Sequence, residues 1–273
     1  MNQTKKILRV GIAGLGTIGG KVATALDRGI PGLQLVAVHT RTEETAREFL
    51  RNFKSKVSLV SAGELAQVAD IIVDCVPKQG FRAVVEPALR AGRTIVTVSG
   101  AALLANEDLI PMADQHGGRL ILASGALLGL DAIRAAAEGE IFSVTMVTRK
   151  PPRSLLGAPY LAEKQIDISN LTEPLQVFKG SAFDGAIGFP SNVNVAAAVG
   201  LAGIGARNTQ LEIWADPGKT RNTHTIKVDA DSARFEMTIE NIPSESNPGT
   251  GKITALSVIT TLRGLVQSLK VGS

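Results

Sequence analysis

The sequence predicts an α/β protein in which an N-terminal doubly wound parallel sheet is followed by a second α+β domain with a mixed or antiparallel sheet. Strand-like and helix-like segments alternate from residue 7 to residue 123, and a glycine-rich turn joins the first strand to the first helix. Period-two strands replace this alternation after about residue 130. We expect residues 1–128 to form the first domain, residues 129–245 the second, and residues 246–273 a C-terminal helix that returns to the first domain.

The glycine-rich turn is the strongest local signal. An apolar run with β-branched residues leads into GLGTIG, and the helical pattern of Val22 and Leu26 follows at once. In such a unit Gly14 permits the tight turn, Gly16 lets a pyrophosphate approach bare backbone, and Gly19 lets the helix pack close to the strand. The alternative is a purely structural turn. We predict a Rossmann-type dinucleotide site formed by Gly14, Gly16, Thr17, Ile18 and Gly19.

The N-terminal segment imitates a secretory signal. Lys5, Lys6 and Arg9 precede an apolar stretch, and Ala23-Thr24-Ala25 resembles a cleavage site. Glycines interrupt the stretch, and a strand over residues 35–38 follows at the spacing that a βαβ unit needs. We therefore expect the segment to be retained and the protein to be cytoplasmic.

The composition narrows the class of protein. With 44% hydrophobic and 20% charged residues, the chain can bury one large core or two moderate ones. The single cysteine, Cys75, excludes a disulfide framework and a cysteine-cluster metal site, and its apolar strand indicates a buried, inert thiol.

The net charge of +4 comes from scattered Lys and Arg, so we expect small anionic ligands and no nucleic acid. The longest apolar stretch, residues 193–206, is too short to span a bilayer, so we expect no membrane association.

The rest of the first domain is predicted as alternating strands and helices. Strands are expected over residues 34–38, 57–60, 70–76, 94–98 and 119–123. Helices are expected over residues 42–53, 61–68, 81–91 and 106–116, with Thr42 and Asn106 as N-caps. Because a ligand binds at the carboxyl ends of such strands, we expect the small residues around Ser99 and Ala126 to lie close to it.

The end of the second strand carries no acid. An NAD site usually places Asp or Glu there to hold the ribose hydroxyls, whereas an Arg accommodates a 2′-phosphate. Here Thr40, Arg41 and Thr42 offer one charge and two hydroxyls. We therefore favour NADP over NAD, with Thr40 and Arg41 as cofactor contacts. The alternative is that Arg41 stacks on the adenine from solvent, which would allow both cofactors.

The second domain opens with a helix over residues 131–138. Period-two alternation over residues 142–149, 210–215, 224–228 and 233–241 indicates an antiparallel sheet with one covered face. An Ala-rich helix over residues 192–204 begins at Ser191-Asn192, and a last helix covers residues 252–269.

Three histidines are candidates for proton transfer. His39 ends the second strand, and His116 lies near the end of a polar helix, where a helix-dipole contact explains it. His224 begins a strand of the second domain, a position that is more often structural than catalytic. It gains weight because a dehydrogenase acting at an amine or alcohol carbon needs a group that titrates near neutrality to move a proton as hydride leaves. Lys150 is the competing base.

Six blocks carry a family resemblance: GLGTIG, SGALLGLDAI, TRKPP, FDGAIGFPSNVNVAAAVGLAG, NTHTI and SNPGTGK. They span nearly the whole chain and resemble the L-aspartate dehydrogenase family, which is similar in fold to dihydrodipicolinate reductase and homoserine dehydrogenase. The resemblance implies NAD(P)-dependent oxidative deamination of L-aspartate through iminoaspartate, which hydrolyses to oxaloacetate and ammonia or feeds NAD biosynthesis. It matches His224 to the catalytic histidine, and Ala126 and Asn194 to cofactor-contacting positions, with Asn192 as the alternative to Asn194.

A dicarboxylic amino acid needs anion-binding groups. Lys150, Arg149, the backbone N–H groups near Ser99 and the helix start at Asn192 are available for its carboxylates. The alternatives are that Arg149 and Lys150 form a solvated strand end and that Asn192 is only an N-cap. By analogy, the sheet of the second domain suggests a homodimer.

Two other functions stay open. A reductase of another small dicarboxylic imine or amino acid, similar to dihydrodipicolinate reductase, predicts a cluster of basic and His residues in the second domain that the sequence lacks. If the chain were a non-catalytic NAD(P)-sensing protein, its site should have lost the catalytic residues. The presence of His224, Lys150 and the NVNVAAA segment argues against such a loss.

Overall fold

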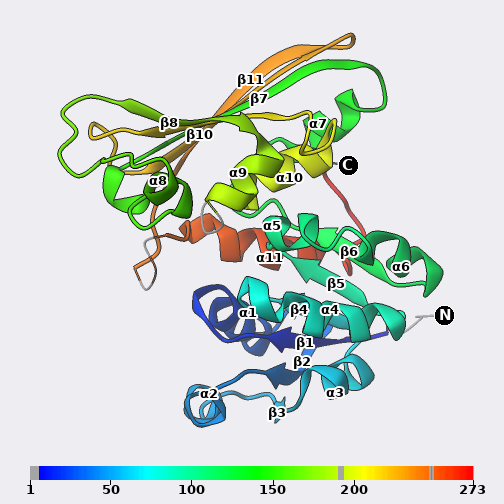
Figure 1. The fold of residues 1–273 in the computed structure, drawn as a ribbon. Helices are drawn as coiled ribbons and strands as arrows, with labels where there is room; N and C mark the ends of the chain where they lie inside the picture. The colour runs from blue at the N-terminus through cyan, green and yellow to red at the C-terminus, as the bar shows by residue number, and fades with distance from the viewer. Residues whose placement is uncertain (1–5, 190–193, 246, 248, 273) are drawn as a thin grey trace. The chain divides into compact units, whose positions relative to one another are not determined.

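The computed structural model describes residues 6–189, 194–245, 247 and 249–272 (Figure 1). The chain divides into two compact units. The first extends to Ala123 and includes Thr254–Lys270, and the second comprises Ser124–Ile253 and Val271–Ser273. Within the described residues, no helix has the length and apolar character needed to cross a membrane.

The first unit contains a six-stranded sheet with the strand order β3-β2-β1-β4-β5-β6. Its strands are β1 (Leu8–Ala13), β2 (Leu33–His39), β3 (Ser58–Leu59), β4 (Ile71–Asp74), β5 (Thr94–Thr97) and β6 (Arg119–Leu122). All neighbours are parallel, and this order is that of a doubly wound dinucleotide-binding sheet, which confirms the predicted fold class. The order reverses between β1 and β4, where the register pairs Ala13 with Asp74 at the carboxyl ends.

The helices of the first unit are α1 (Thr17–Arg28), α2 (Glu43–Leu50), α3 (Ala62–Val68), α4 (Phe81–Arg90), α5 (Gly100–Leu104), α6 (Leu109–Gln115) and α11 (Lys252–Gly264), with a 3-10 turn η1 (Lys78–Gly80). The start of α3 follows from local sequence, because Ser61 and Glu64 form a capping box. The Ser61 hydroxyl accepts the Glu64 N–H, and the Glu64 carboxylate accepts the Ser61 N–H.

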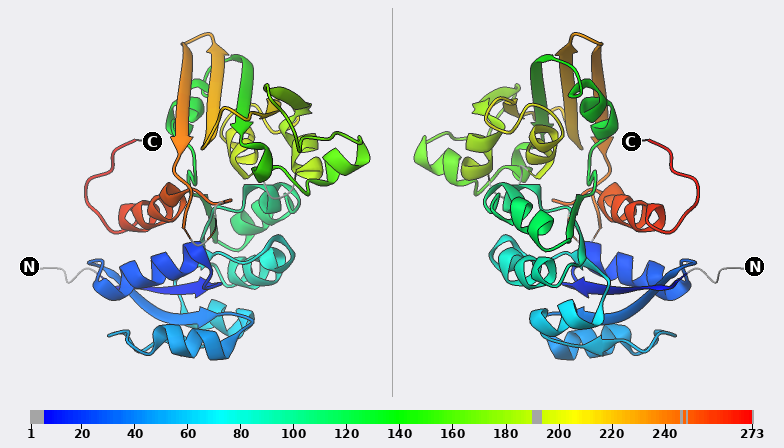
Figure 2. Two further views of the ribbon diagram at one scale, coloured as in Figure 1. Left: turned by 90° about the vertical axis from the view of Figure 1, so that its left-hand side faces the viewer. Right: turned by 90° about the vertical axis from the view of Figure 1, so that its right-hand side faces the viewer.

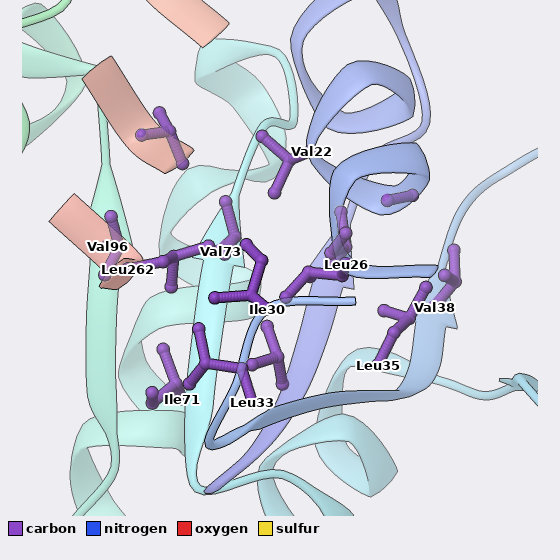
Figure 3. Packing of buried hydrophobic residues seen from close by; sticks show 14 of the residues in the cluster. Val22, Leu26, Ile30, Leu33, Leu35, Val38, Ile71, Val73, Val96 and Leu262 are labelled. Atoms are coloured by element: carbon purple, nitrogen blue, oxygen red, sulfur yellow. The ribbon is translucent and has the colours of Figure 1, made fainter. Parts of the chain in front are cut away.

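An apolar cluster of the first unit lies between the sheet and helices α1 and α11 (Figure 3). Val22 and Leu26 of α1 pack with strand residues such as Leu35 and Val73. Leu262 of α11 lies near Val96 in the same cluster and is fully buried, so a helix from the far end of the chain completes this core. Helices α3 and α4 contact the same strands through residues outside this cluster.

One predicted helix start differs from the structure, and another lacks the predicted capping hydrogen bond. The segment predicted as one helix over residues 106–116 is divided, and α6 begins only at Leu109. Asn106 is not its N-cap, because the Asn106 Nδ2 donates to the Ala102 carbonyl and so stabilises the end of α5. Thr42 does occupy the N-cap position of α2, but its side chain makes no capping hydrogen bond.

The second unit contains a five-stranded sheet with the order β11-β10-β7-β9-β8. Its strands are β7 (Ile141–Lys150), β8 (Leu175–Ser181), β9 (Gln210–Ala215), β10 (Asn222–Ala230) and β11 (Arg234–Asn241). The sheet is mixed, because β7 and β9 are parallel, so the purely antiparallel alternative is wrong. Strand β8 was not predicted from the sequence. A register shift between Gln176 and Phe178 buries Val177 and Phe178 in succession, which removes the period-two pattern.

One face of this sheet is covered by helices (Figure 2). The helices of the unit are α7 (Leu130–Ala136), α8 (Pro159–Glu163), α9 (Ala182–Gly188) and α10 (Asn194–Ala202), with a 3-10 turn η2 (Pro152–Ser154). The sequence analysis missed α8 and α9, which have five and seven residues and are too short to show a helical apolar period. The covered face is apolar along most of its length, with Met146, Ile226 and Leu211 buried side by side in the register.

Candidate functional site

The glycine turn of the first unit has the geometry that a bound pyrophosphate needs. Gly14 has a φ of +89°, and a Cβ there would lie 2.6 Å from the Cys75 carbonyl oxygen. A Cβ on Gly19 would collide with the Gly14 carbonyl, so both positions require glycine. A Cβ on Gly16 would instead point into open space, and α1 begins directly after it at Thr17. The first N–H groups of a helix have no partner inside the helix, so the turn fits a dinucleotide phosphate.

The end of β2 presents the predicted cofactor contacts at the surface. Thr40 is half-buried and Arg41 is exposed, and Arg41 makes no ion pair among the described residues. His39 is tied to β3, since its Nδ1 lies 3.1 Å from the Val60 carbonyl oxygen. The structure therefore leaves Arg41 accessible to a ligand and holds His39 in a structural contact.

A buried carboxylate that the sequence analysis did not single out lies at the carboxyl end of β4. Asp74 is fully buried, and its Oδ2 accepts the Thr97 hydroxyl at 2.7 Å. The Thr97 Oγ1 in turn accepts the Ser99 N–H at 2.9 Å. This N–H, which we expected to bind a substrate carboxylate, is therefore already paired. Burial raises the pKa of Asp74 to about 6. An acid that ends the apolar run IIVD was the signal that could have revealed it.

His224 lies on the covered face of the second unit. It is 3% exposed, and its register partner on β7 is Thr148, whose Oγ1 lies 3.1 Å from His224 Nδ1. Period-two alternation along β7 places Lys150 on the same face, one side-chain position beyond Thr148. The structure thus brings His224 and Lys150 together from two adjacent strands.

Burial controls the charges of this pair. Lys150 is 4% exposed, and burial lowers its pKa to about 8. Burial and the positive charge of Lys150 together lower the pKa of His224 to about 3. In this structure the imidazole is therefore neutral throughout the neutral range, and the pKa of Lys150 lies closer to neutrality than that of His224.

Arg149 is not brought to this face. Its register partner is Thr223, which neighbours His224 and points to the opposite side of the sheet. The guanidinium lies over the Trp214 ring at 4.5 Å from the centroid, and its Nη1 lies 3.4 Å from Asp216 Oδ2. These contacts explain Arg149 as a residue of the sheet, so we do not assign it to the substrate.

The remaining predicted contacts lie in the second unit, one in a loop and one at the start of a helix. The Ala126 carbonyl accepts a hydrogen bond from Asn241 Nδ2 at 3.1 Å, so a buried side chain at the end of β11 holds the SGA loop. Asn194 is exposed at the first residue of α10. Asn192 lies outside the described residues.

The parallel sheet, the glycine turn and a buried neutral imidazole define a class of protein, the nicotinamide-dinucleotide-dependent oxidoreductases. Comparison with known families supports this class of protein. Residues 14–123 match the homoserine dehydrogenase NAD-binding domain, and residues 131–265 match the C-terminal domain of aspartate dehydrogenase.

The chain belongs to the L-aspartate dehydrogenase family. It is 52% identical to an L-aspartate dehydrogenase of Bradyrhizobium diazoefficiens over 97% of this chain and 94% of the relative. It is 49% identical to L-aspartate dehydrogenase 3 of Bordetella bronchiseptica over 99% of both chains. The crystal structure of the Thermotoga maritima aspartate dehydrogenase has the same fold, with a TM-score of 0.75 at 24% identity over 97% of this chain and 99% of that chain.

Proposed function

We propose that this chain catalyses the NAD(P)-dependent oxidative deamination of L-aspartate through iminoaspartate, which hydrolyses to oxaloacetate and ammonia or feeds NAD biosynthesis. The observation that carries this proposal is a neutral His224 next to a buried Lys150. Aspartate needs both a proton acceptor for its ammonium group and a fixed positive charge for a carboxylate. Family membership supports the same reaction.

A nicotinamide dinucleotide held at the glycine turn would supply the hydride acceptor for this reaction. Lys150 holds one substrate carboxylate by an ion pair that burial strengthens. His224 accepts a proton from the substrate ammonium, which frees the nitrogen lone pair so that hydride can leave the α-carbon. Once the imidazolium has released this proton to solvent, the same imidazole accepts a proton from the water that attacks the imine carbon.

The hydrogen bond to Thr148 is the basis for our choice of the basic imidazole nitrogen. When His224 Nδ1–H donates to the Thr148 hydroxyl, the lone pair is on Nε2, at the end of the ring that points away from β7. The hydrogen bond also holds the ring in one orientation. We therefore assign Nε2 as the proton acceptor.

The cofactor assignment rests on the glycine turn and the end of β2. Gly14, Gly16, Thr17, Ile18 and Gly19 hold the pyrophosphate. Thr40 and Arg41 favour a 2′-phosphate, since no acid stands at this strand end. We infer a preference for NADP over NAD. Ala126 and Asn194 are proposed as further cofactor contacts, and Asn192 as a substrate contact at the helix start.

We also infer a cytoplasmic homodimer that takes a small dicarboxylic substrate. The single cysteine supports a compartment that does not require disulfides. The homodimer rests on the analogy of the second-unit sheet, and sedimentation of the purified protein at increasing concentration tests it.

Absorbance of the reduced nicotinamide tests the reaction directly. Purified protein is given NADP or NAD with L-aspartate, L-asparagine, L-glutamate or L-malate. Oxidation of aspartate with little turnover of the others is expected, because asparagine lacks the second carboxylate and malate lacks the amine. Preferred turnover of malate would contradict an amino-acid dehydrogenase, and no turnover of any of the four would contradict the proposed function.

A further inference from the structure

Asp74 is a buried charge that the proposed chemistry does not use. It lies in the first unit at the carboxyl end of β4, with Ala13 of β1 and Thr97 of β5 as its register partners on either side. No ion pair neutralises it among the described residues. A buried carboxylate without a cation costs free energy, and such a cost is typical of a group that serves function more than stability.

The Asp74 carboxylate closes two turns at this edge of the sheet. Its Oδ1 accepts the Val76 N–H at 3.2 Å, which fixes the turn after β4. Its Oδ2 accepts the Thr97 hydroxyl at 2.7 Å, and Thr97 accepts the Ser99 N–H at 2.9 Å, which fixes the turn after β5. The Ser99 side chain also hydrogen-bonds to Asp74. Every group that faces the carboxylate in these contacts is a donor.

The first of these turns supports the glycine turn. The Cys75 carbonyl is the atom that a Cβ on Gly14 would approach at 2.6 Å, and the Cys75 Cβ would lie 3.3 Å from a Cβ on Gly19. Cys75, directly after Asp74, therefore lies close to both ends of the glycine turn, with its carbonyl beside Gly14 and its Cβ beside Gly19. A shift of Cys75 would move the residues that meet the pyrophosphate.

We propose that Asp74 is a positioning residue for the nicotinamide dinucleotide, which holds the Cys75 backbone against the glycine turn through its hydrogen bonds to Val76 and Thr97. The inference rests on the proposed function only in requiring that cofactor class. This positioning role requires that both carboxylate oxygens of Asp74 accept hydrogen bonds. An asparagine has one acceptor and one donor group, so Asp74→Asn loses the negative charge, and its N–H can meet the Thr97 hydroxyl only if that hydroxyl rotates to accept instead of donate.

The dissociation constant for NADPH, measured by fluorescence titration at neutral pH, tests the proposal. Asp74→Asn is expected to raise it by roughly tenfold or more, since a hydrogen bond to a charged group contributes about 1.5–3 kcal/mol. The matched control is Asp70→Asn. Asp70 precedes the same strand at its amino end, where it forms an ion pair with Arg9 at 2.9 Å that helps to lower its pKa to about 2. This control is expected to lower stability and leave the NADPH dissociation constant unchanged.

A second pair of variants keeps the test decisive if Asp74→Asn does not fold. Thr97→Val removes the hydroxyl that links Asp74 to Ser99 and is expected to weaken NADPH binding. Thr97→Ser keeps the hydroxyl and is expected to restore it. Thermal unfolding followed by circular dichroism shows which variants are folded.

The pH dependence gives an independent readout. A carboxyl group that takes up a proton loses an acceptor, so binding to the parent protein is expected to weaken as pH falls below the Asp74 pKa of about 6. NADH is used for this series, because the phosphate monoester of NADPH titrates in the same range. The register partners Ala13 and Thr97 do not titrate here, and burial raises the pKa of the neighbouring Cys75 thiol, with Asp74 as the second cause, so it stays protonated. Asp74→Asn is expected to remove this pH dependence.

The outcomes separate two conclusions. A parent protein that binds no nicotinamide dinucleotide would overturn both this inference and the proposed function. Normal binding by folded Asp74→Asn, or equal weakening by Asp70→Asn, would overturn this inference alone.

Discussion

Thr148 and His224, which are 76 residues apart in the sequence, form a buried hydrogen bond between adjacent strands of the second unit. The Oγ1 of Thr148 lies 3.1 Å from Nδ1 of His224. This bond holds the imidazole ring, and when Nδ1–H is the donor it leaves Nε2 as the nitrogen that we propose accepts a proton.

Removal of the Thr148 hydroxyl should therefore reduce catalysis without affecting the cofactor. We expect Thr148→Val to lower kcat by ~10–100-fold, the equivalent of a lost buried hydrogen bond of about 1–3 kcal/mol. Thr148→Ser should restore most of the activity. Nitrogen chemical shifts of the His224 ring should report a change of tautomer in Thr148→Val, which a purely structural role would not produce.

Thr223→Val is the matched control for this substitution. Thr223 neighbours His224 on β10 but points to the opposite side of the sheet, and its buried hydroxyl has no hydrogen-bond partner among the described residues. We expect unchanged kcat and equal or higher stability, because the valine removes an unsatisfied polar group. A loss of kcat equal to that of Thr148→Val would show that any disturbance of this sheet has the same effect.

His224→Ala tests the proton acceptor itself. We expect kcat to fall by roughly 10²–10⁴-fold, the usual contribution of a general acid–base group, with the NADPH dissociation constant unchanged. The measurement is steady-state oxidation of aspartate together with fluorescence titration of the cofactor. Retention of more than about a tenth of the parental kcat would transfer the role to another group, with Lys150 tested next.

The charge state of His224 has its own test. Burial, reinforced by Lys150, lowers the pKa of His224 from 6.5 to about 3. Between these values the unfolded chain binds the proton that the folded chain excludes, so this residue makes stability fall as pH drops from about 6.5 toward about 3. In an NMR titration of the cofactor-free protein, the His224 ring should remain neutral throughout the neutral range. Its protonation near neutral pH would contradict the effect of burial.

Lys150→Met separates substrate binding from stability. Loss of the positive charge should raise KM for aspartate sharply and leave the cofactor dissociation constant unchanged. Since burial lowers the Lys150 pKa to about 8, the parent protein should bind succinate well below that pH and progressively less above it. The variant should bind weakly at every pH, yet unfold at a higher temperature, because a buried ammonium is costly. Lys227→Met, at an exposed position of β10 that pairs with Glu236, is the control.

Arg41 determines the cofactor preference that we infer. The parent protein should bind NADPH more tightly than NADH, and Arg41→Asp should reverse this order by repelling the 2′-phosphate and accepting the ribose hydroxyls. Arg47→Asp provides the control, since Arg47 lies nearby on α2 and pairs with Glu43 on the same helix. Equal dissociation constants for both cofactors in the parent would remove Arg41 from this role.

The sequence by itself determined the features that depend on neighbouring residues. The glycine turn was predictable because Gly14 adopts a positive φ that few other residues tolerate. The strand–helix alternation of the first unit and the period-two strands of the second were predictable because each reflects burial of one face of a single element. His224 was a candidate as one of three histidines and through the family resemblance, and Lys150 was a candidate as the competing base.

Only the tertiary structure decided how these elements meet. The parallel pairing of β7 with β9 and the bulged β8 depend on contacts between distant segments, and no local pattern specifies them. The face of β7 that meets His224 excludes Arg149 and includes Thr148, because strand register assigns alternate residues to opposite sides. The charges of His224, Lys150 and Asp74 follow from burial by residues far away in the chain, since desolvation acts through the folded surroundings of a group.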